Sequence, residues 1–348
     1  MNILVSQSLF DYALMKPLSS SYKLDRLCIV SGYATHAMAA RHLIETTKTG
    51  YNLNVDLIYG MAGTEGVRKT NHLGFLSLIE HNEFQYNGSF DCSYVKKPRS
   101  VHSKVYVWCK ENRPVMAFAG SANYSESGFS CSSRIETLVE CDPVSAYDFF
   151  IETKKHTQSC KDVDRLDVYT KISHNKSALR QQTSQSITIE NDKNSPFYGN
   201  EKISLSLLTN KGDTGNGSRL NWGVRPDGRP RESKGKNGKL SFRNPNQSYI
   251  GLPVQFQKCG FFPDVGQHFT VLTDDNKIFT CVRAQANGKG IETPQDNSEI
   301  GRYMRHRLGL GDGAYISVSD LEKYGRFDVV FYKLDNENYV MDFSRPSN

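Results

Sequence analysis

Two strand-like stretches, Val101–Cys109 (VHSKVYVWC) and Val115–Asn123 (VMAFAGSAN), decide the fold of the N-terminal half of this sequence. Both are rich in the β-branched and aromatic residues typical of strands. The first stretch carries His102 and Lys104 near its start. Residues two apart in a strand point to the same face, so this spacing can present an imidazole and an ammonium group to one ligand.

Polar residues also end the second stretch and open a third. Ser121 and Asn123 repeat the two-residue spacing and would add neutral hydrogen-bond donors beside Lys104. Glu136 begins a third apolar run, and a carboxylate there could accept the second ring proton of a histidine and hold its tautomer. A surface carboxylate is the alternative interpretation, since Glu140 lies close by in the sequence.

This set of side chains suits the cleavage of a phosphodiester bond. Such an enzyme must neutralise the non-bridging oxygens, supply a nucleophile and protonate the leaving oxygen. A neutral imidazole can attack phosphorus to form a covalent phosphohistidine, and a protonated imidazole can donate to the leaving group. One His-x-Lys pair is a weak motif in a chain of this size, but a second polar pair after a neighbouring predicted strand makes the set informative.

The pattern His-x-Lys, Gly-Ser-x-Asn and a later glutamate resembles the half-site of the phospholipase D superfamily. The superfamily pattern has an aspartate a few residues after the lysine, whereas Lys110 and Glu111 occupy that region here. In this respect the chain is similar to the nuclease branch, whose members commonly lack the aspartate and use a later glutamate. There the histidine is the nucleophile, the lysine, serine and asparagine hold phosphate, and the glutamate orients the histidine. The resemblance assigns these roles, in that order, to His102, Lys104, Ser121, Asn123 and Glu136.

The sequence supplies one such half-site. Neither His174 nor His268 is followed by a Gly-Ser-x-Asn element. Because the two-step mechanism needs a nucleophile and a separate acid, the resemblance implies a homodimer through the catalytic domain, with both half-sites facing each other across a two-fold axis.

Length and composition favour a soluble enzyme of about two domains. The 348 residues contain no apolar run of about eighteen residues or more, and the N-terminus has neither a basic region nor a cleavage site. The eight cysteines form no Cys-x-x-Cys pair. This spacing argues against structural zinc and suits reduced thiols, so we expect a cytoplasmic protein without metal or membrane.

Strand-like and helical patterns alternate in the first half, which predicts an α/β (α+β) domain with a mixed sheet and helices on its faces. Tyr59–Gly63 follows a strand and is either a turn or part of the mouth of the site. The predicted strands are Arg26–Ser31, Leu53–Tyr59, Cys92–Lys96, Val101–Cys109, Val115–Gly120 and Glu136–Cys141, and the predicted helices are His36–Thr47, Asn71–Glu83 and Val144–Thr157.

The remainder of the chain has a different composition. Residues 175–200 are mostly polar and predict a linker, which separates a catalytic domain at 1–174 from a second domain at 201–348. Short apolar segments separated by Gly, Asn, Asp and Pro predict a small all-β barrel or sandwich there. These segments are Ile203–Leu208, Tyr249–Phe256, His268–Leu272, Ile278–Ala284, Tyr315–Val318 and Phe327–Leu334.

Positive charge is concentrated in one part of this second domain. Residues 202–243 hold ten basic and three acidic residues, a local balance of ten minus three, or +7, in a chain of net charge +6. Such a patch predicts a polyanionic partner, and a solvated basic loop is the alternative. A second cluster, including Arg307, follows the polar loop 287–299, so two polar arms suit a clamp on double-stranded DNA. The predicted DNA-binding residues are Lys211, Arg219, Trp222, Arg225, Arg229, Arg231, Lys234, Asn287, Lys289, Arg302 and Arg305.

The whole domain order resembles restriction endonucleases of the BfiI and NgoFVII type, with the NgoFVII-like branch closer. Their C-terminal domain is similar to the plant B3 DNA-binding fold, so the resemblance implies a B3-like pseudobarrel here. It also implies metal-independent DNA cleavage, no cofactor, and a separate ATPase or helicase-like subunit as a candidate partner. No Gly-x-x-x-x-Gly-Lys-Ser/Thr loop occurs in this chain, so ATP would act only through that partner.

Two other functions are alternatives to a site-specific DNA endonuclease. The first is another phosphodiesterase of the phospholipase D superfamily, such as a phospholipid-processing enzyme, although no amphipathic membrane-binding helix is recognisable. The second is a catalytically silent DNA-binding protein, against which the intact histidine, lysine, serine and asparagine set argues.

Overall fold

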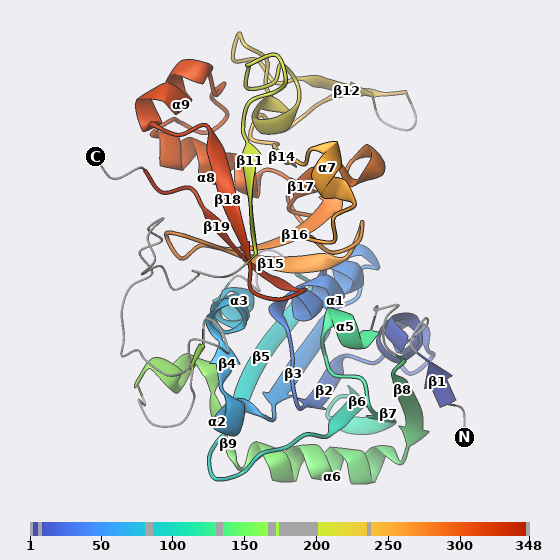
Figure 1. The fold of residues 1–348 in the computed structure, drawn as a ribbon. Helices are drawn as coiled ribbons and strands as arrows, with labels where there is room; N and C mark the ends of the chain where they lie inside the picture. Colours follow the sequence, from blue (N-terminus) through green and yellow to red (C-terminus); the bar gives the residue numbers. More distant parts are fainter. Residues whose placement is uncertain are drawn as a thin grey trace. The chain divides into compact units, whose positions relative to one another are not determined.

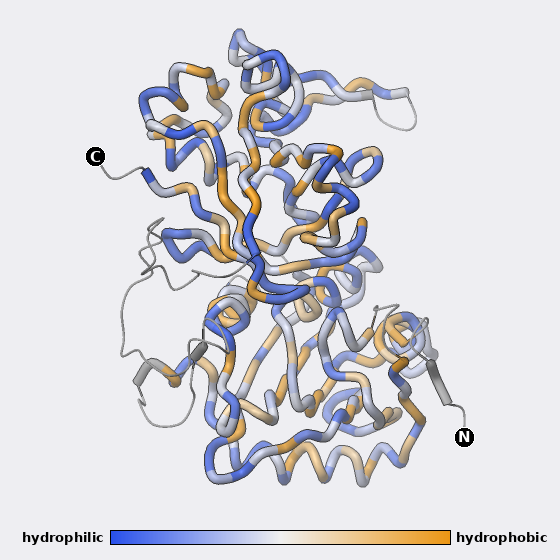
Figure 2. Tube along the Cα trace, in the orientation of Figure 1, coloured by the Kyte–Doolittle hydropathy of each residue, from blue (hydrophilic) through white to orange (hydrophobic). Residues whose placement is uncertain are grey.

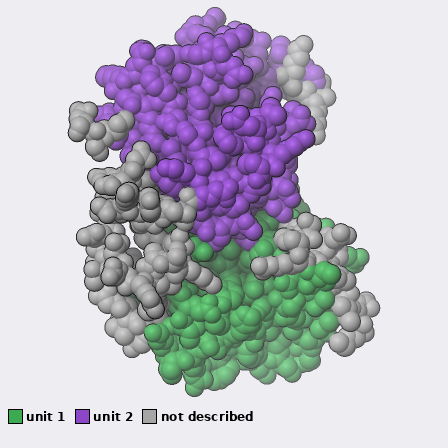
Figure 3. Space-filling model, in the orientation of Figure 1, with its two compact units in different colours: residues 1–182 green, residues 183–348 purple. Residues whose placement is uncertain are grey.

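The computed structural model describes residues 3–5, 9–80, 86–129, 135–165, 172–173, 201–234 and 238–345. The chain forms two compact units, residues 1–182 and 183–348 (Figure 3). The predicted polar linker, residues 175–200, lies outside the described residues.

An eight-stranded mixed sheet forms the centre of the first unit (Figure 1). Strands β2, β3 and β5 run parallel to one another, and the other neighbouring strands pair antiparallel. The sheet confirms the predicted mixed α/β fold. In spatial order the strands are β1 (Ile3–Val5), β8 (Thr137–Cys141), β7 (Arg113–Gly120), β6 (Lys104–Lys110), β2 (Arg26–Ser31), β3 (Leu53–Tyr59), β5 (Gly88–Val95) and β9 (Thr157–Ser159).

Helices cover both faces of this sheet. Helices α1 (His36–Lys48) and α3 (Lys69–Glu80) share a core with Leu27 of β2, whereas α6 (Pro143–Lys154) shares a second core with Cys28. Neighbouring residues of β2 therefore enter opposite cores, as expected for a strand buried on both faces. Figure 2 shows polar and apolar residues alternating along α6, which packs one side on the sheet.

The second unit is built on a seven-stranded sheet whose end strands, β11 and β14, approach each other, so that the sheet is a nearly closed pseudobarrel (Figure 1). Only β15 and β19 pair in parallel among its described strands. The predicted β pseudobarrel is confirmed. In spatial order the strands are β11 (Lys202–Ser206), β18 (Asp328–Lys333), β19 (Asn338–Asp342), β15 (His268–Thr273), β16 (Ile278–Ala284), β17 (Gly290–Glu292) and β14 (Ile250–Gly251).

The second unit also contains helices that the sequence did not predict. Helix α8 (Glu299–Leu308) follows β17, and α9 (Val318–Tyr324) occupies part of the segment 315–318 that was predicted to be a strand. The strand prediction is wrong because Ser317 and Asp320 form a capping box, in which each side chain accepts a hydrogen bond from the other residue's backbone N–H.

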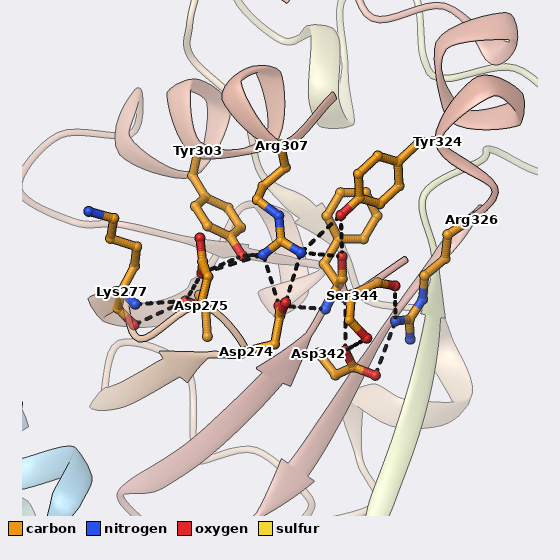
Figure 4. Close-up of polar contacts among 11 residues, drawn as sticks. Asp274, Asp275, Lys277, Tyr303, Arg307, Tyr324, Arg326, Asp342 and Ser344 are labelled. Carbon is orange, nitrogen blue, oxygen red and sulfur yellow. Dashed lines mark hydrogen bonds and ion pairs between the residues drawn. The ribbon is translucent and has the colours of Figure 1, made fainter. Parts of the chain in front are cut away.

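An ionic network fixes α8 and α9 to the ends of the sheet strands (Figure 4). Arg307 of α8 lies 2.7 Å from Asp274 and donates to the hydroxyl of Tyr324 in α9 at 2.9 Å. Arg326 lies 3.0 Å from Asp342 of β19. These cations are paired within the unit, so Arg307 stabilises the fold and is not a free basic residue of the predicted second arm.

Candidate active site and DNA-binding surface

His102 and Lys104 lie at one end of β6. The strand begins at Lys104, which pairs with Ser31 at the end of β2, so His102 precedes the strand and does not lie within it as predicted. The Lys104 Nζ atom is 3.0 Å from Nδ1 of His102 and 2.5 Å from the His102 backbone oxygen. The two side chains therefore meet because the lysine folds back onto the histidine.

The charge of Lys104 is largely removed from solvent. Its exposed fraction is 6%, while His102 is exposed. Burial lowers the pKa of Lys104, and the charge of Glu136 acts in the opposite direction. The ammonium group also lies 3.3 Å from Nε2 of His102, so it contacts both ring nitrogens. The pair thus places a desolvated cation directly against an imidazole ring.

Ser121 and Asn123 follow the end of β7, beside the start of β6, because these two strands are antiparallel neighbours. The Ser121 hydroxyl donates to Glu136 and accepts from the backbone N–H of Thr137 at 3.0 Å. Within the described residues, Glu136 is thus bonded to Ser121 and not to His102. The orientation of the histidine by Glu136 stays a prediction, because the described residues show this carboxylate bonded to Ser121.

Gly32 and Tyr33, which follow β2, lie between His102 and Asn123. A Cβ atom on Gly32 would be 2.9 Å from Cδ2 of His102 and 3.5 Å from Oδ1 of Asn123. The backbone N–H of Tyr33 donates to that Oδ1 atom at 3.1 Å, which leaves the Asn123 amide nitrogen as a donor for a ligand. Histidine and asparagine therefore flank one glycine.

The Tyr33 side chain lies against the histidine. Its ring meets that of His102 edge-on, with centroids 5.6 Å apart, and its hydroxyl donates to Glu65 at 2.7 Å. Burial, followed by the hydrogen bond and charge of Glu65, raises the pKa of Tyr33 to about 12, so the phenol is neutral at physiological pH. Sequence reasoning did not identify Tyr33 or Glu65.

The turn after β3 holds the segment that leads into His102. Val101 donates to the backbone oxygen of Gly60 at 3.0 Å, and a Cβ on Gly60 would lie only 1.9 Å from the Val101 oxygen. Only glycine allows this approach. The Tyr59–Gly63 stretch is thus a turn that also supports the site, which combines the two interpretations left open by the sequence.

These residues gather where the parallel strands β2 and β3 end, the usual position of sites in sheets with parallel strands. Lys104 offers a cation, Asn123 an amide N–H₂ group and His102 an imidazole. The other histidines described near this sheet core, His36, His42 and His72, are buried. His174 precedes Lys176 at the same His-x-Lys spacing, but both lie outside the described residues and no Gly-Ser-x-Asn follows them. The described residues contain no group of three or more His, Cys, Asp or Glu able to hold a metal ion.

The predicted basic residues of the first arm differ in what they contact. Arg219 donates to backbone oxygens of Ser206 and Leu208 at 3.1 and 2.6 Å, and Arg231 donates to the oxygen of Trp222 at 2.9 Å. These two arginines therefore stabilise their own loop. Arg225 forms a half-exposed ion pair with Glu232, and Arg229 forms an exposed one with Asp227. Lys211 is exposed and Trp222 is half-buried. Lys234 lies in the strand Glu232–Lys234.

The second arm is only partly available to a ligand. Asn287 and Lys289 are exposed in the connection between β16 and β17, and Arg302 is ion-paired with Asp296. Arg305 is 0% exposed and donates to the backbone oxygens of several loops, including that of Ala314 at 2.7 Å. Burial lowers its pKa to about 10. The prediction that Arg305 contacts DNA is wrong in this structure, because its guanidinium group is enclosed.

The mixed sheet and the histidine–lysine half-site define a phosphodiesterase of the phospholipase D-like class. Residues 7–167 match the family described as NgoFVII restriction endonuclease N-terminal PLD domain, and residues 196–335 match NgoFVII C-terminal B3-like DNA-binding domain. Together these ranges span most of the chain. The chain therefore belongs to the NgoFVII restriction endonuclease family, as the sequence resemblance predicted.

Solved structures give more distant similarities. The chain is similar to NucT from Helicobacter pylori, with 19% identity over 45% of this chain and 97% of that chain and a TM-score of 0.31. The phospholipase D family member Nuc from Salmonella typhimurium is 14% identical over 45% of this chain and 97% of that chain, with a TM-score of 0.31. Polyphosphate kinase from Porphyromonas gingivalis is 13% identical over 44% of this chain and 22% of that chain, with a TM-score of 0.30. No curated protein sequence matches the chain. None of the helices in the described ranges has the length and apolar character needed to span a membrane.

Proposed function

We propose that this protein is a site-specific DNA endonuclease of a restriction system, which cleaves phosphodiester bonds through a covalent phosphohistidine on His102 and without a metal ion. The observation that supports this most directly is the grouping of His102 and Lys104 with Asn123 around Gly32 in a member of this endonuclease family. Nucleases of the phospholipase D superfamily are generally metal-independent, and the steps that we assign to His102, Lys104 and Asn123 use no metal ion.

The first step is attack by a His102 ring nitrogen on phosphorus. The bond from phosphorus to the leaving oxygen breaks, and that oxygen takes a proton from a second imidazole. Lys104 and the Asn123 amide neutralise and orient the non-bridging oxygens. Ser121 joins them when its hydroxyl turns from Glu136 to the phosphate. Glu136 thus sets the orientation of Ser121 in the free site.

The second step is hydrolysis of the phosphohistidine. Water attacks phosphorus, its proton passes to the second imidazole, and the bond from His102 to phosphorus breaks. One chain supplies one half-site, so we assign the second imidazole to His102 of a second copy in a homodimer formed by the first unit. This arrangement gives one composite site per dimer.

DNA recognition is assigned to the second unit, which matches a B3-like DNA-binding domain. Its exposed basic and polar residues Lys211, Arg225, Arg229, Asn287 and Lys289 are the candidates for direct contact. A separate ATPase or helicase-like subunit is a further candidate partner. We also place the protein in the cytoplasm, where the cysteines of the described ranges would stay as the free thiols seen here.

The test is incubation of the purified protein with supercoiled plasmid in EDTA, alongside His102→Ala and a matched histidine control, His156→Ala. His156 is a partly exposed histidine of the same unit that pairs with Glu152. We expect discrete fragments from wild type and from His156→Ala, and no cleavage but unchanged gel-shift binding for His102→Ala. Equal cleavage by His102→Ala would contradict the mechanism, and DNA binding without cleavage by wild type would favour the silent binding protein or a need for a motor subunit.

A further inference from the structure

A two-stranded hairpin in the second unit exposes apolar side chains in a strongly basic region. Strands β12 (Glu232–Lys234) and β13 (Leu240–Phe242) pair only with each other. Leu240 is 60% exposed and Phe242 is 72% exposed. Two large apolar side chains this exposed, only two positions apart in one strand, form an apolar surface that requires an explanation.

The strand register places both apolar side chains on one face of the hairpin. Phe242 lies opposite Glu232, and Leu240 lies opposite residue 234. Directly opposed residues and residues two apart share a face of an antiparallel ribbon. The other face carries Ser233 and Ser241. The face that carries Leu240 and Phe242 therefore also carries Glu232, whose carboxylate lies 3.6 Å from Arg225, and the other face is small and polar.

The base of the hairpin is held firmly to the body of the second unit. The backbone N–H of Arg243 donates to the oxygen of Arg231 at 2.8 Å, and the Arg243 guanidinium lies 4.4 Å from the centre of the Trp222 ring. That ring packs edge-on against buried Tyr249. Because these contacts fix the direction in which the ribbon leaves the unit, the face that carries Leu240 and Phe242 is presented to the surroundings in a defined orientation.

The charge around the hairpin indicates which ligand covers this face. Residues 202–243 carry ten basic and three acidic residues, which favours a polyanion over another protein surface of ordinary charge. The major groove of duplex DNA admits a two-stranded β-ribbon, and the apolar group that it presents there is the C5-methyl of thymine.

We propose that the β12–β13 ribbon enters the major groove and packs Leu240 and Phe242 against thymine methyl groups, so that this hairpin recognises A·T pairs at fixed positions of the target. The inference rests on the proposed DNA-binding function and adds an apolar contact to the expected polar ones. It names Leu240 and Phe242 as specificity-determining residues.

The experiment uses the full chain carrying His102→Ala, so that bound DNA is not cut. This protein first selects its preferred duplex from a randomised library, and each thymine of that duplex is then replaced by uracil, which lacks only the methyl group. We expect uracil to weaken binding about four-fold at each contacted position, the effect of one buried methyl group. In the additional variant Leu240→Ala/Phe242→Ala, uracil should have no effect at those positions.

Two controls make the result specific. Val254→Ala, which removes another highly exposed apolar side chain of the same unit, should leave the uracil effect unchanged. Sedimentation should give the same oligomeric state for all variants. If the double variant loses no affinity, shows the same uracil dependence or changes only its self-association, the inference is overturned. If the starting protein selects no sequence at all, the proposed function fails first.

Discussion

Substitution of Gly32 by alanine is the sharpest test of the active-site geometry. The added Cβ would lie 2.9 Å from Cδ2 and 3.2 Å from Cα of His102, whereas ordinary contact begins at 3.4 Å. The imidazole must therefore move by about 0.5 Å. Displacements near 1 Å cost about 100-fold in rate, so we expect cleavage to fall by about 10- to 100-fold, equivalent to about 1.4–2.7 kcal/mol of activation free energy.

Stability should change much less than activity in this variant. His102 is exposed and can shift, so the free energy of unfolding should fall by about 1 kcal/mol or less, below the usual cost of overpacking a core. Single-turnover plasmid cleavage and thermal unfolding measure the two effects. Gly311→Ala is the matched control, since nothing lies within 4 Å of its Cβ position. A cleavage rate within about two-fold of wild type, at saturating protein, would refute the geometry.

Three further predictions concern charged groups. Lys104→Met keeps the buried stem but removes the cation, so single-turnover cleavage should fall by about 100- to 1000-fold with DNA binding retained. Burial lowers the pKa of His36 and of His42 from 6.5 to about 3. Their unfolded forms therefore bind more protons between those values, and the melting temperature should decline as pH falls from 6.5 towards 3, less steeply in His36→Gln/His42→Gln. Arg305→Ala should destabilise the second unit by about 3 kcal/mol or more in denaturant unfolding, because it leaves several buried carbonyls unpaired, whereas half-exposed Arg302→Ala should cost under about 1 kcal/mol.

The local pattern of the sequence was sufficient to predict the catalytic strands and most of their neighbours. Strands β2 and β3 have the predicted bounds, and α1 differs by one residue at its end. Their alternation and capping signals are local, so they can be recognised without the fold. The His102–Lys104 spacing was likewise visible, although the strand begins at Lys104 and not at the expected Val101.

The residues that hold the active site in place could not be predicted from local sequence patterns. Gly32 and Gly60 matter because β2 lies between β6 and β3 in the sheet, which brings two distant strand ends against the segment before β6. Tyr33 approaches His102 across nearly seventy intervening positions for the same reason. Non-local strand order decides these contacts, and a single sequence carries no direct signal of it.

Charge composition was an even weaker guide to function, because it does not show where a cation finds its partners. Arg305, Arg219 and Arg231 are satisfied by backbone carbonyls of their own unit, so a ligand has little to offer them. Arg225 and Arg229 are held by exposed carboxylates, which phosphate groups can replace.

This difference leads to a measurable contrast between two kinds of arginine. Arg225→Ala and Arg229→Ala should each reduce the dependence of log affinity on log salt concentration by about one unit, without changing the melting temperature. Arg219→Ala should lower the melting temperature, because it leaves the oxygens of Ser206 and Leu208 without their donor. Lys104 follows the same reasoning in the active site: its ammonium is desolvated and contacts the backbone oxygen and ring nitrogens of His102, so the negative charge of an incoming phosphodiester would add to that of Glu136. An Arg225→Ala variant with an unchanged salt slope would show that a carboxylate partner does not mark a DNA-contacting cation.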